Sequence, residues 1–177
     1  MKSLVLIFSI SIIFFCKSNL AETIAVVNIQ TLIDNNNKYL EILKKIEISQ
    51  EEYSEKLKKK EFELNKMLND IEDSKLILNE SEINLQIQNY NKELSDFTTL
   101  VDEFNYHYQN QVINIRENIL KEIISLLEEY ALKNNVDLIF DSTTYLIASN
   151  SIDITNNINE KLTNINFKLE YEEFKKN

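Results

Sequence analysis

The stretch from residue 38 to residue 133 constrains the fold most, because it contains no glycine or proline and repeats apolar residues at heptad spacing. Such spacing keeps an apolar seam on one side of a helix and favours a supercoil with a partner helix. The seam is regular in the second half of the stretch, at Ile83, Ile87, Tyr90, Leu94, Phe97, Val101, Phe104 and Tyr108. It is looser in the first half, at Leu43, Ile46, Tyr53, Leu57, Leu64, Met67, Ile71 and Leu78, with polar breaks at Gln50, Lys60 and Ser74. Two seams in succession predict one long antiparallel helical hairpin, the arm.

The two heptad registers fail to join between Leu78 and Ile83, which places the tip of the arm near residues 78–82. Ser81 is the expected N-cap of the returning helix, because its hydroxyl can accept a hydrogen bond from a free backbone N–H. Without glycine, Asn79 is expected to take the left-handed conformation at the end of the first helix. Helices of about 40 to 50 residues, at about 1.5 Å per residue, would make an arm about 60–75 Å long.

Residues 1–21 have the pattern of a secretory signal peptide. Lys2 precedes an apolar run from residue 4 to residue 15, and cleavage is expected after Ala21. The run is short for a membrane span, so an uncleaved anchor is the alternative. Cys16 raises the further alternative of lipid attachment, although the bulky Phe15 precedes it. Cleavage after Ala21 would leave no cysteine, which excludes disulfide and thiol chemistry in the mature chain.

Short apolar segments flank the arm on both sides. Residues 22–37 are expected to form the first part of a body, with a β-branched strand at 23–29 followed by a helical turn. Residues 134–163 are expected to complete it, with strands at 136–140 and 143–148 that form a hairpin. A short helix should follow from residue 156 to residue 162. The tail from residue 164 to residue 177 is expected to be frayed.

Three short strands and part of one helix bury too little surface to be stable alone, and open strand edges invite pairing with other copies. The sequence therefore predicts an α+β fold, in which a long antiparallel coiled-coil hairpin is inserted into a small β body completed by homo-oligomerisation. The strand count alone allows either a dimer or a trimer. The candidate residues of the oligomeric body are Ile24, Val26, Val136, Leu138, Phe140, Tyr145 and Ile147.

The charge and the reactive residues exclude several classes of function. The net charge is −10, and loss of Lys2 and Lys17 with a signal peptide would make it −12. Nucleic acid is therefore not an expected partner, because no basic patch offsets the phosphate repulsion. His107 is the only histidine, so no metal site is expected around it. Serine and threonine residues lack a base partner, so neither an enzyme nor a cofactor is expected.

Three parts of the chain together resemble a known family. They are Ile24-Ala25-Val26-Val27-Asn28, the charged hairpin, and Val136-Asp137-Leu138-Ile139-Phe140-Asp141 followed by Tyr145, Ala148-Ser149-Asn150-Ser151 and Asp153-Ile154-Thr155. The chain up to about Leu162 is similar to the Skp (OmpH-like) family of periplasmic chaperones. The resemblance implies a homotrimer with a shared β-barrel body and three arms around a cavity. It also implies an ATP-independent holdase that keeps unfolded outer-membrane β-barrel proteins from aggregating in the periplasm.

The acidic charge departs from the family, whose well-known members are basic. Contact with lipopolysaccharide or a membrane surface is therefore not expected here. Phe62 and Tyr106 lie off the seam and are the candidate contacts with unfolded clients, since aromatic side chains supply large contact areas. The alternative is that both are ordinary surface residues. The rival function is a structural spacer or adaptor of the cell envelope that docks through the tip of its arm.

Overall fold

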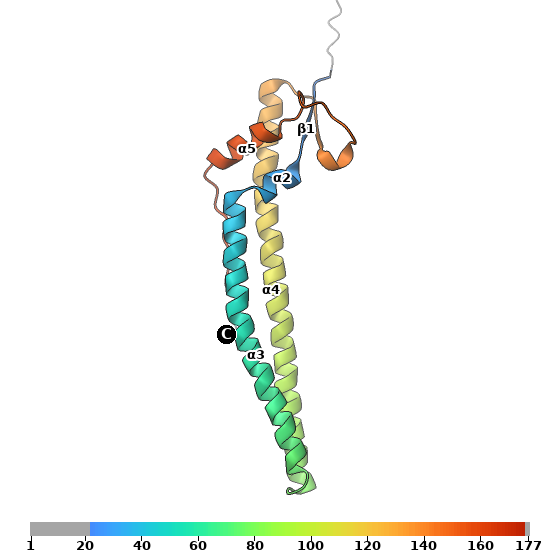
Figure 1. Ribbon diagram of the computed structural model, residues 1–177, viewed down its shortest axis with the longest axis vertical. Helices are drawn as coiled ribbons and strands as arrows, with labels where there is room; N and C mark the ends of the chain where they lie inside the picture. Colours follow the sequence, from blue (N-terminus) through green and yellow to red (C-terminus); the bar gives the residue numbers. More distant parts are fainter. Residues whose placement is uncertain (1–21, 176–177) are drawn as a thin grey trace, which may run out of the picture.

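The computed structural model describes residues 22–175 and shows a long helical hairpin with a small body at one end (Figure 1). The signal peptide expected at residues 1–21 lies outside the described residues. The elements in chain order are β1 (Ile24–Val27), α2 (Ile29–Asp34), α3 (Asn37–Ser74), α4 (Glu80–Asn134), β2 (Leu138–Asp141), the 3-10 helix η1 (Ser142–Thr144) and α5 (Thr155–Asn164). No helix in the described range is both long enough and apolar enough to cross a membrane.

Helices α3 and α4 form the arm and confirm the predicted antiparallel hairpin (Figure 1). Helix α3 has 38 residues and α4 has 55, and both can be this long because no glycine or proline interrupts them. Near the body, seam residues such as Ile46, Phe104 and Tyr108 are buried. Towards the tip, the α3 residues Leu64 and Ile71 are still buried, but on α4 the seam residues are half-buried or exposed, as at Leu94. The α4 side of the seam is therefore less well covered in the outer half of the arm.

The tip differs from the prediction in both of its caps. Asn79, not Ser81, is the N-cap of α4: its side chain accepts a hydrogen bond from Glu82 N at 3.0 Å, and Glu82 Oε2 accepts one from Asn79 N at 3.1 Å. This capping box needs an acidic residue three positions after the cap, which Ser81 lacks because Asn84 stands there. Asn79 is accordingly extended rather than left-handed. The left-handed residue in the described range is Asn135, where α4 ends.

The sheet of the body is built around β1. Strand β2 pairs parallel to it, from Ile24 opposite Leu138 to Val27 opposite Asp141. The other edge of β1 carries a bridge to the segment before α5, in which Val26 N donates to Ile152 O and Ile154 N donates to Val26 O, both at 2.9 Å. Segments far apart in the sequence thus close the body around the first strand.

The predicted strand at residues 143–148 and its hairpin are wrong. Residues 142–144 form η1, and the following residues are irregular, with Leu146 and Ile147 almost entirely exposed. The reason is local: the Thr143 hydroxyl donates to Asp141 Oδ2 at 2.6 Å, and the Thr144 hydroxyl donates to Asp141 O at 2.7 Å. Such side-chain bonds offer the backbone a turn in place of a ladder. They end β2 without reversing the chain.

The body is held together by one apolar core. Ala25 and Val27 on the inner side of β1 pack with residues of α2, α4 and α5, including Ile119, Ile123 and Ile158, which are fully buried. Helix α5 confirms the predicted short helix. The tail, expected to be frayed, differs: its apolar residues pack against the same core, and it descends beside α3 (Figure 1). Its alternating apolar residues give it one side to bury, despite its terminal position.

Candidate functional site

One face of the sheet points away from the core. Side chains alternate along a strand, and parallel partners share a face, so Ile24, Val26, Leu138 and Phe140 lie together. We call these four residues the outer sheet face. Ile24, Leu138 and Phe140 are partly exposed, and Phe140 retains 42% of its surface. Val26, in contrast, is only 3% exposed within the single chain. Apolar side chains are thus partly exposed on this face, beside the unpaired outer edge of β2 in the described part of the chain.

The other candidate body residues divide in the same way. Ile147, in the loop after η1, is almost completely exposed, as is its neighbour Leu146. Val136 and Tyr145 are half-buried, and Val136 packs against the core. Ile24, Leu138, Phe140 and Ile147 therefore lie at the surface of the body, whereas Val26 is buried inside it.

Two carboxylates fasten this sheet to the rest of the body. Asp137 Oδ2 accepts a hydrogen bond from Thr23 N at 2.8 Å. Asp141 Oδ1 accepts one from Ile29 N, at the start of α2, at 3.1 Å. Burial acts to raise the pKa of Asp141, but the bonds from Thr143 and Ile29 outweigh it and lower the pKa below its usual value. Sequence reasoning missed this anchoring role, although an acidic residue at the end of a strand was a visible signal.

The two candidate client contacts on the arm are exposed but separate. Phe62 on α3 and Tyr106 on α4 retain 71% and 69% of their surface. Phe62 is close in sequence to Lys60, which pairs with Glu93, whereas Tyr106 is close to Phe104, which stacks on Tyr53. Because α3 and α4 are antiparallel, Tyr106 lies near the level of residue 51 of α3, eleven residues from Phe62, or roughly 16 Å along the helix. The structure exposes both aromatic rings and does not join them into one patch.

The tail adds an aromatic cluster to the base of the arm that was not predicted. The ring of Phe174 lies edge-on to Tyr53 at 4.9 Å, to His107 at 5.4 Å and to Phe104 at 5.7 Å, measured between ring centroids. Burial, reinforced by Tyr108 and Glu103 nearby, raises the pKa of Tyr53. His107 thus packs in an aromatic cluster. Among residues 22–175, no group of three or more acidic, histidine or cysteine residues is placed to hold a metal ion.

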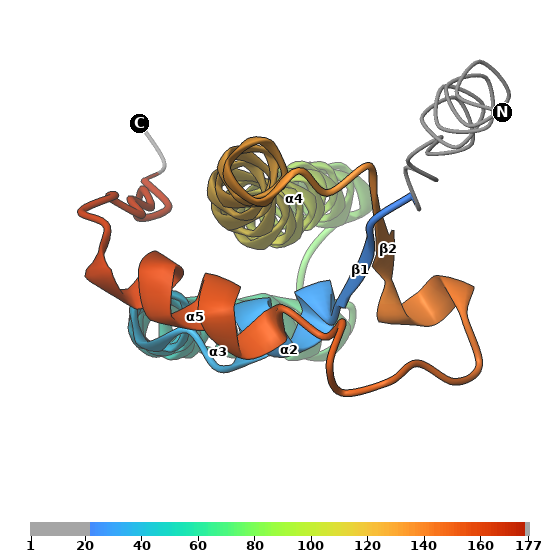
Figure 2. The ribbon, with the colours of Figure 1, turned by 90° about the horizontal axis from the view of Figure 1, so that it is seen from above.

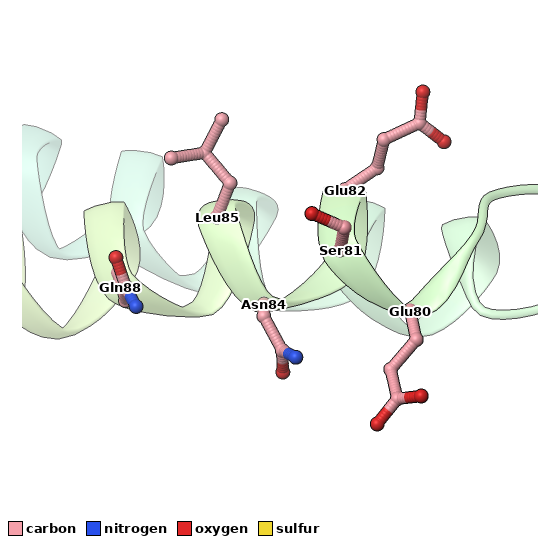
Figure 3. Close-up of a pocket in the computed structure, with 6 residues that line it drawn as sticks. All are labelled: Glu80, Ser81, Glu82, Asn84, Leu85 and Gln88. Atoms are coloured by element: carbon pink, nitrogen blue, oxygen red, sulfur yellow. The ribbon is translucent and has the colours of Figure 1, made fainter.

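The tip presents exposed apolar residues in an acidic setting. Leu76 and Ile77 in the turn and Leu85 on α4 are largely exposed. A shallow hollow on α4 is lined by Glu80, Ser81, Glu82, Asn84, Leu85 and Gln88 (Figure 3). Figure 3 shows Glu82 and Leu85 on one side of the helix and Glu80 and Asn84 on the other. Their polar groups do not converge, so the hollow is not arranged to bind a small ligand.

Comparisons with known proteins agree with the fold. The sequence model of the family described as outer membrane protein (OmpH-like) matches residues 23–162. A crystal structure from Caulobacter crescentus CB15, provisionally designated an outer membrane chaperone (OmpH-like), has a TM-score of 0.70 at 8% sequence identity, covering 85% of this chain and 92% of that one. No curated protein sequence matches the chain. At this identity the structural likeness concerns the fold, whereas the family match covers most of the sequence.

Proposed function

The chain belongs to the OmpH-like family, and from this membership we propose that it is an ATP-independent holdase of the periplasm. Its clients would be unfolded outer-membrane β-barrel proteins, which it would bind and keep from aggregating. The observation that carries the proposal is the family match, because it runs through both the body and the arm. The chaperone designation of the structural neighbour supports it.

The proposed assembly is a homotrimer joined through the outer sheet face. Ile24, Leu138 and Phe140 leave apolar surface uncovered in one chain, and burial of such surface contributes about 25 cal/mol per Å². The outer edge of β2 has no strand partner among the described residues. A neighbouring subunit could supply one. Three arms extending from a shared body would then enclose a cavity.

Clients would be held by many weak contacts rather than by a deep pocket. The described part of the arm offers exposed aromatic rings at Phe62 and Tyr106, on separate levels of a thin hairpin. Such spacing suits a chain without fixed structure, because promiscuous binders use adaptable surfaces. The sequence has no glycine with which to build a glycine-rich phosphate loop, which agrees with holding without ATP.

The test is an aggregation assay with the purified mature protein. An outer-membrane β-barrel protein denatured in urea is diluted into buffer without ATP, and its turbidity is followed with and without the chaperone. We expect turbidity to fall to near the buffer baseline at about one trimer per client. Aggregation that proceeds at the same rate with an excess of the folded protein would reject the holdase function.

A second candidate function, an adaptor that docks through its tip, is favoured by the exposed Leu76 and Ile77. The double substitution Leu76→Ser and Ile77→Ser tests whether the exposed tip takes part in holding the client. A holdase that works along its arms should lose little protection of the client. If the wild-type protein gives no protection while remaining a folded oligomer, the adaptor becomes the better account.

A further inference from the structure

The tail from residue 165 to residue 175 lies extended along the base of the arm, beyond the end of the family match at residue 162. From residue 165 to residue 172 its residues alternate between half-buried and exposed. The half-buried residues are Ile165, Phe167, Leu169 and Tyr171, and the exposed ones between them are Asn166, Lys168, Glu170 and Glu172. This period of two means that one side of an extended chain faces the arm and the other faces water. We call the surface beneath it the arm groove, formed by Lys38, Tyr53, Phe104, His107, Tyr108 and Gln111.

The arm groove binds the main chain of the tail. Lys38 Nζ donates to the carbonyl oxygens of Ile165 and Phe167, at 3.0 and 3.3 Å. At the far end, Gln111 Oε1 accepts from the N–H of Glu172 at 3.2 Å, and His107 Nε2 is 2.7 Å from the carbonyl oxygen of the same residue. These bonds use groups that almost every polypeptide possesses. They would therefore form with an extended segment of another sequence.

Further contacts come from aromatic side chains. They favour a segment with aromatic residues at suitable spacing rather than one particular sequence. The Phe167 ring lies 4.6 Å from Lys38 Nζ, a cation–π distance. Seven residues later, Phe174 enters the aromatic cluster with Tyr53, Phe104 and His107, and its N–H donates to the Tyr108 hydroxyl at 3.4 Å. The groove thus has two aromatic positions joined by a stretch that accepts alternating apolar side chains.

We propose that the arm groove is a binding site for extended amphipathic polypeptide segments and that the tail occupies it as a built-in competitor. The occupant we infer is a client segment with alternating apolar and polar residues and aromatic side chains. The strands of outer-membrane β-barrels have this alternation. The inference rests on the proposed function, which supplies clients of this class.

Two features make an exchange between tail and client feasible. The tail contacts the arm on one side only, so its outer side chains already lie in water and its release uncovers only the inner side chains and the bonded main chain. The tail and the sheet also lie on opposite sides of α4 (Figure 2). A client in the groove would therefore not compete with assembly through the outer sheet face. Since a tethered segment acts at an effective concentration of about millimolar, the tail would set a threshold that only well-matched segments overcome.

The test uses the full mature chain and a fluorescein-labelled synthetic peptide with the sequence of residues 164–175. Peptide binding is measured by anisotropy to the wild type and to the double variant Phe167→Ser and Phe174→Ser, whose tail has lost its two aromatic anchors. We expect the variant to bind the peptide at least tenfold more tightly than the wild type. A control peptide of the same composition, with its apolar residues made consecutive, should bind the variant at least tenfold more weakly.

No binding by a folded variant, equal binding by variant and wild type, or equal binding of both peptides would overturn the proposal. Circular dichroism and light scattering establish that the variant is folded. Hydrogen exchange of the wild type gives an independent measurement, because added client should speed exchange at Glu172 and Phe174. Unchanged exchange there, with client bound, would also overturn the proposal.

The outcomes separate this proposal from the holdase function. If the variant binds the alternating peptide while neither form protects a barrel protein from aggregation, the groove stands as a peptide site and the holdase function fails. If the protein protects its client and the folded variant does not bind the peptide, the groove proposal fails and the holdase function stands.

Discussion

Replacement of Phe140 by serine should dissociate the assembly without unfolding the subunit. Phe140 lies on the outer sheet face and retains 42% of its surface within one chain, so much of its ring is free for a neighbouring subunit. Val26 is a poorer site for this experiment, because it is only 3% exposed and a polar substitution there would disrupt the body itself.

The magnitude follows from the exposed surface of the ring. A phenylalanine side chain has on the order of 200 Å² of surface, so about 80 Å² of Phe140 would be buried if an interface covered it fully. At about 25 cal/mol per Å² this burial would contribute about 2 kcal/mol per subunit and about 6 kcal/mol per trimer. Since about 1.4 kcal/mol corresponds to a factor of ten, the variant should form trimers about four orders of magnitude more weakly.

The assay is light scattering coupled to size exclusion over a range of protein concentrations. We expect the wild type to keep a trimer mass at concentrations where Phe140→Ser has become monomeric, with unchanged helical circular dichroism. Leu85→Ser is the matched control, because it removes an exposed apolar side chain from the arm and leaves the sheet intact. A Phe140→Ser variant that dissociates over the same concentration range as the wild type would refute the assigned interface.

Three further predictions concern stability, the arm and client contact. Asp141→Ala should lower the free energy of unfolding by about 1 kcal/mol, on the scale of a lost helix cap, in urea titrations at pH 7. Because the folded pKa of Asp141 is lowered, the stability that its carboxylate contributes is present above the unfolded pKa of 3.8 and is lost as the pH falls through the folded pKa. The variant should therefore lose less stability than the wild type between pH 7 and pH 2. An equal loss of stability in both proteins would contradict the anchoring role of Asp141. Leu94→Asn with Val101→Asn should speed hydrogen exchange in the outer arm and leave the mass of the assembly unchanged, and dissociation would contradict the separation of arm from body. Phe62→Ser with Tyr106→Ser should at least halve the protection of a barrel protein in the turbidity assay, and full protection would assign both to ordinary surface.

The arm was predictable from the sequence because a single physical rule dominates it. A heptad seam without glycine or proline leaves a long helix with one apolar side, and the antiparallel hairpin is the simplest way to bury it. The strand at residues 24–27 and the helix near Ile158 were predictable for similar reasons, since their apolar residues face the core. Local pattern and tertiary packing agree in these segments.

The failures occur where a side chain competes with the pattern. The β-branched and aromatic residues at 143–148 favour a strand, but the threonine hydroxyls bond to Asp141 and turn the chain first. Asn79 becomes a cap because Glu82 completes a capping box, a pairing that the heptad break did not reveal. Composition alone does not decide such local competitions.

For the candidate site residues, the sequence indicated which side chains on the arm are exposed, but not which distant segments pair with the strand residues. Phe62 and Tyr106 are exposed, as their positions off the seam indicate. Val26 is buried, and its backbone pairs with a segment more than a hundred residues away that bridges the second edge of β1. The arm groove was missed because its occupant is a chain terminus, for which fraying is the ordinary expectation.

The most direct test of the holdase account is the mass of the purified mature protein, alone and after dilution of a urea-denatured outer-membrane barrel protein into its solution. The account predicts a trimer that gains the mass of one client and stays in a discrete soluble complex without ATP. A trimer whose mass is unchanged while the client precipitates would contradict the holdase function. A stable monomer would contradict the proposed assembly as well.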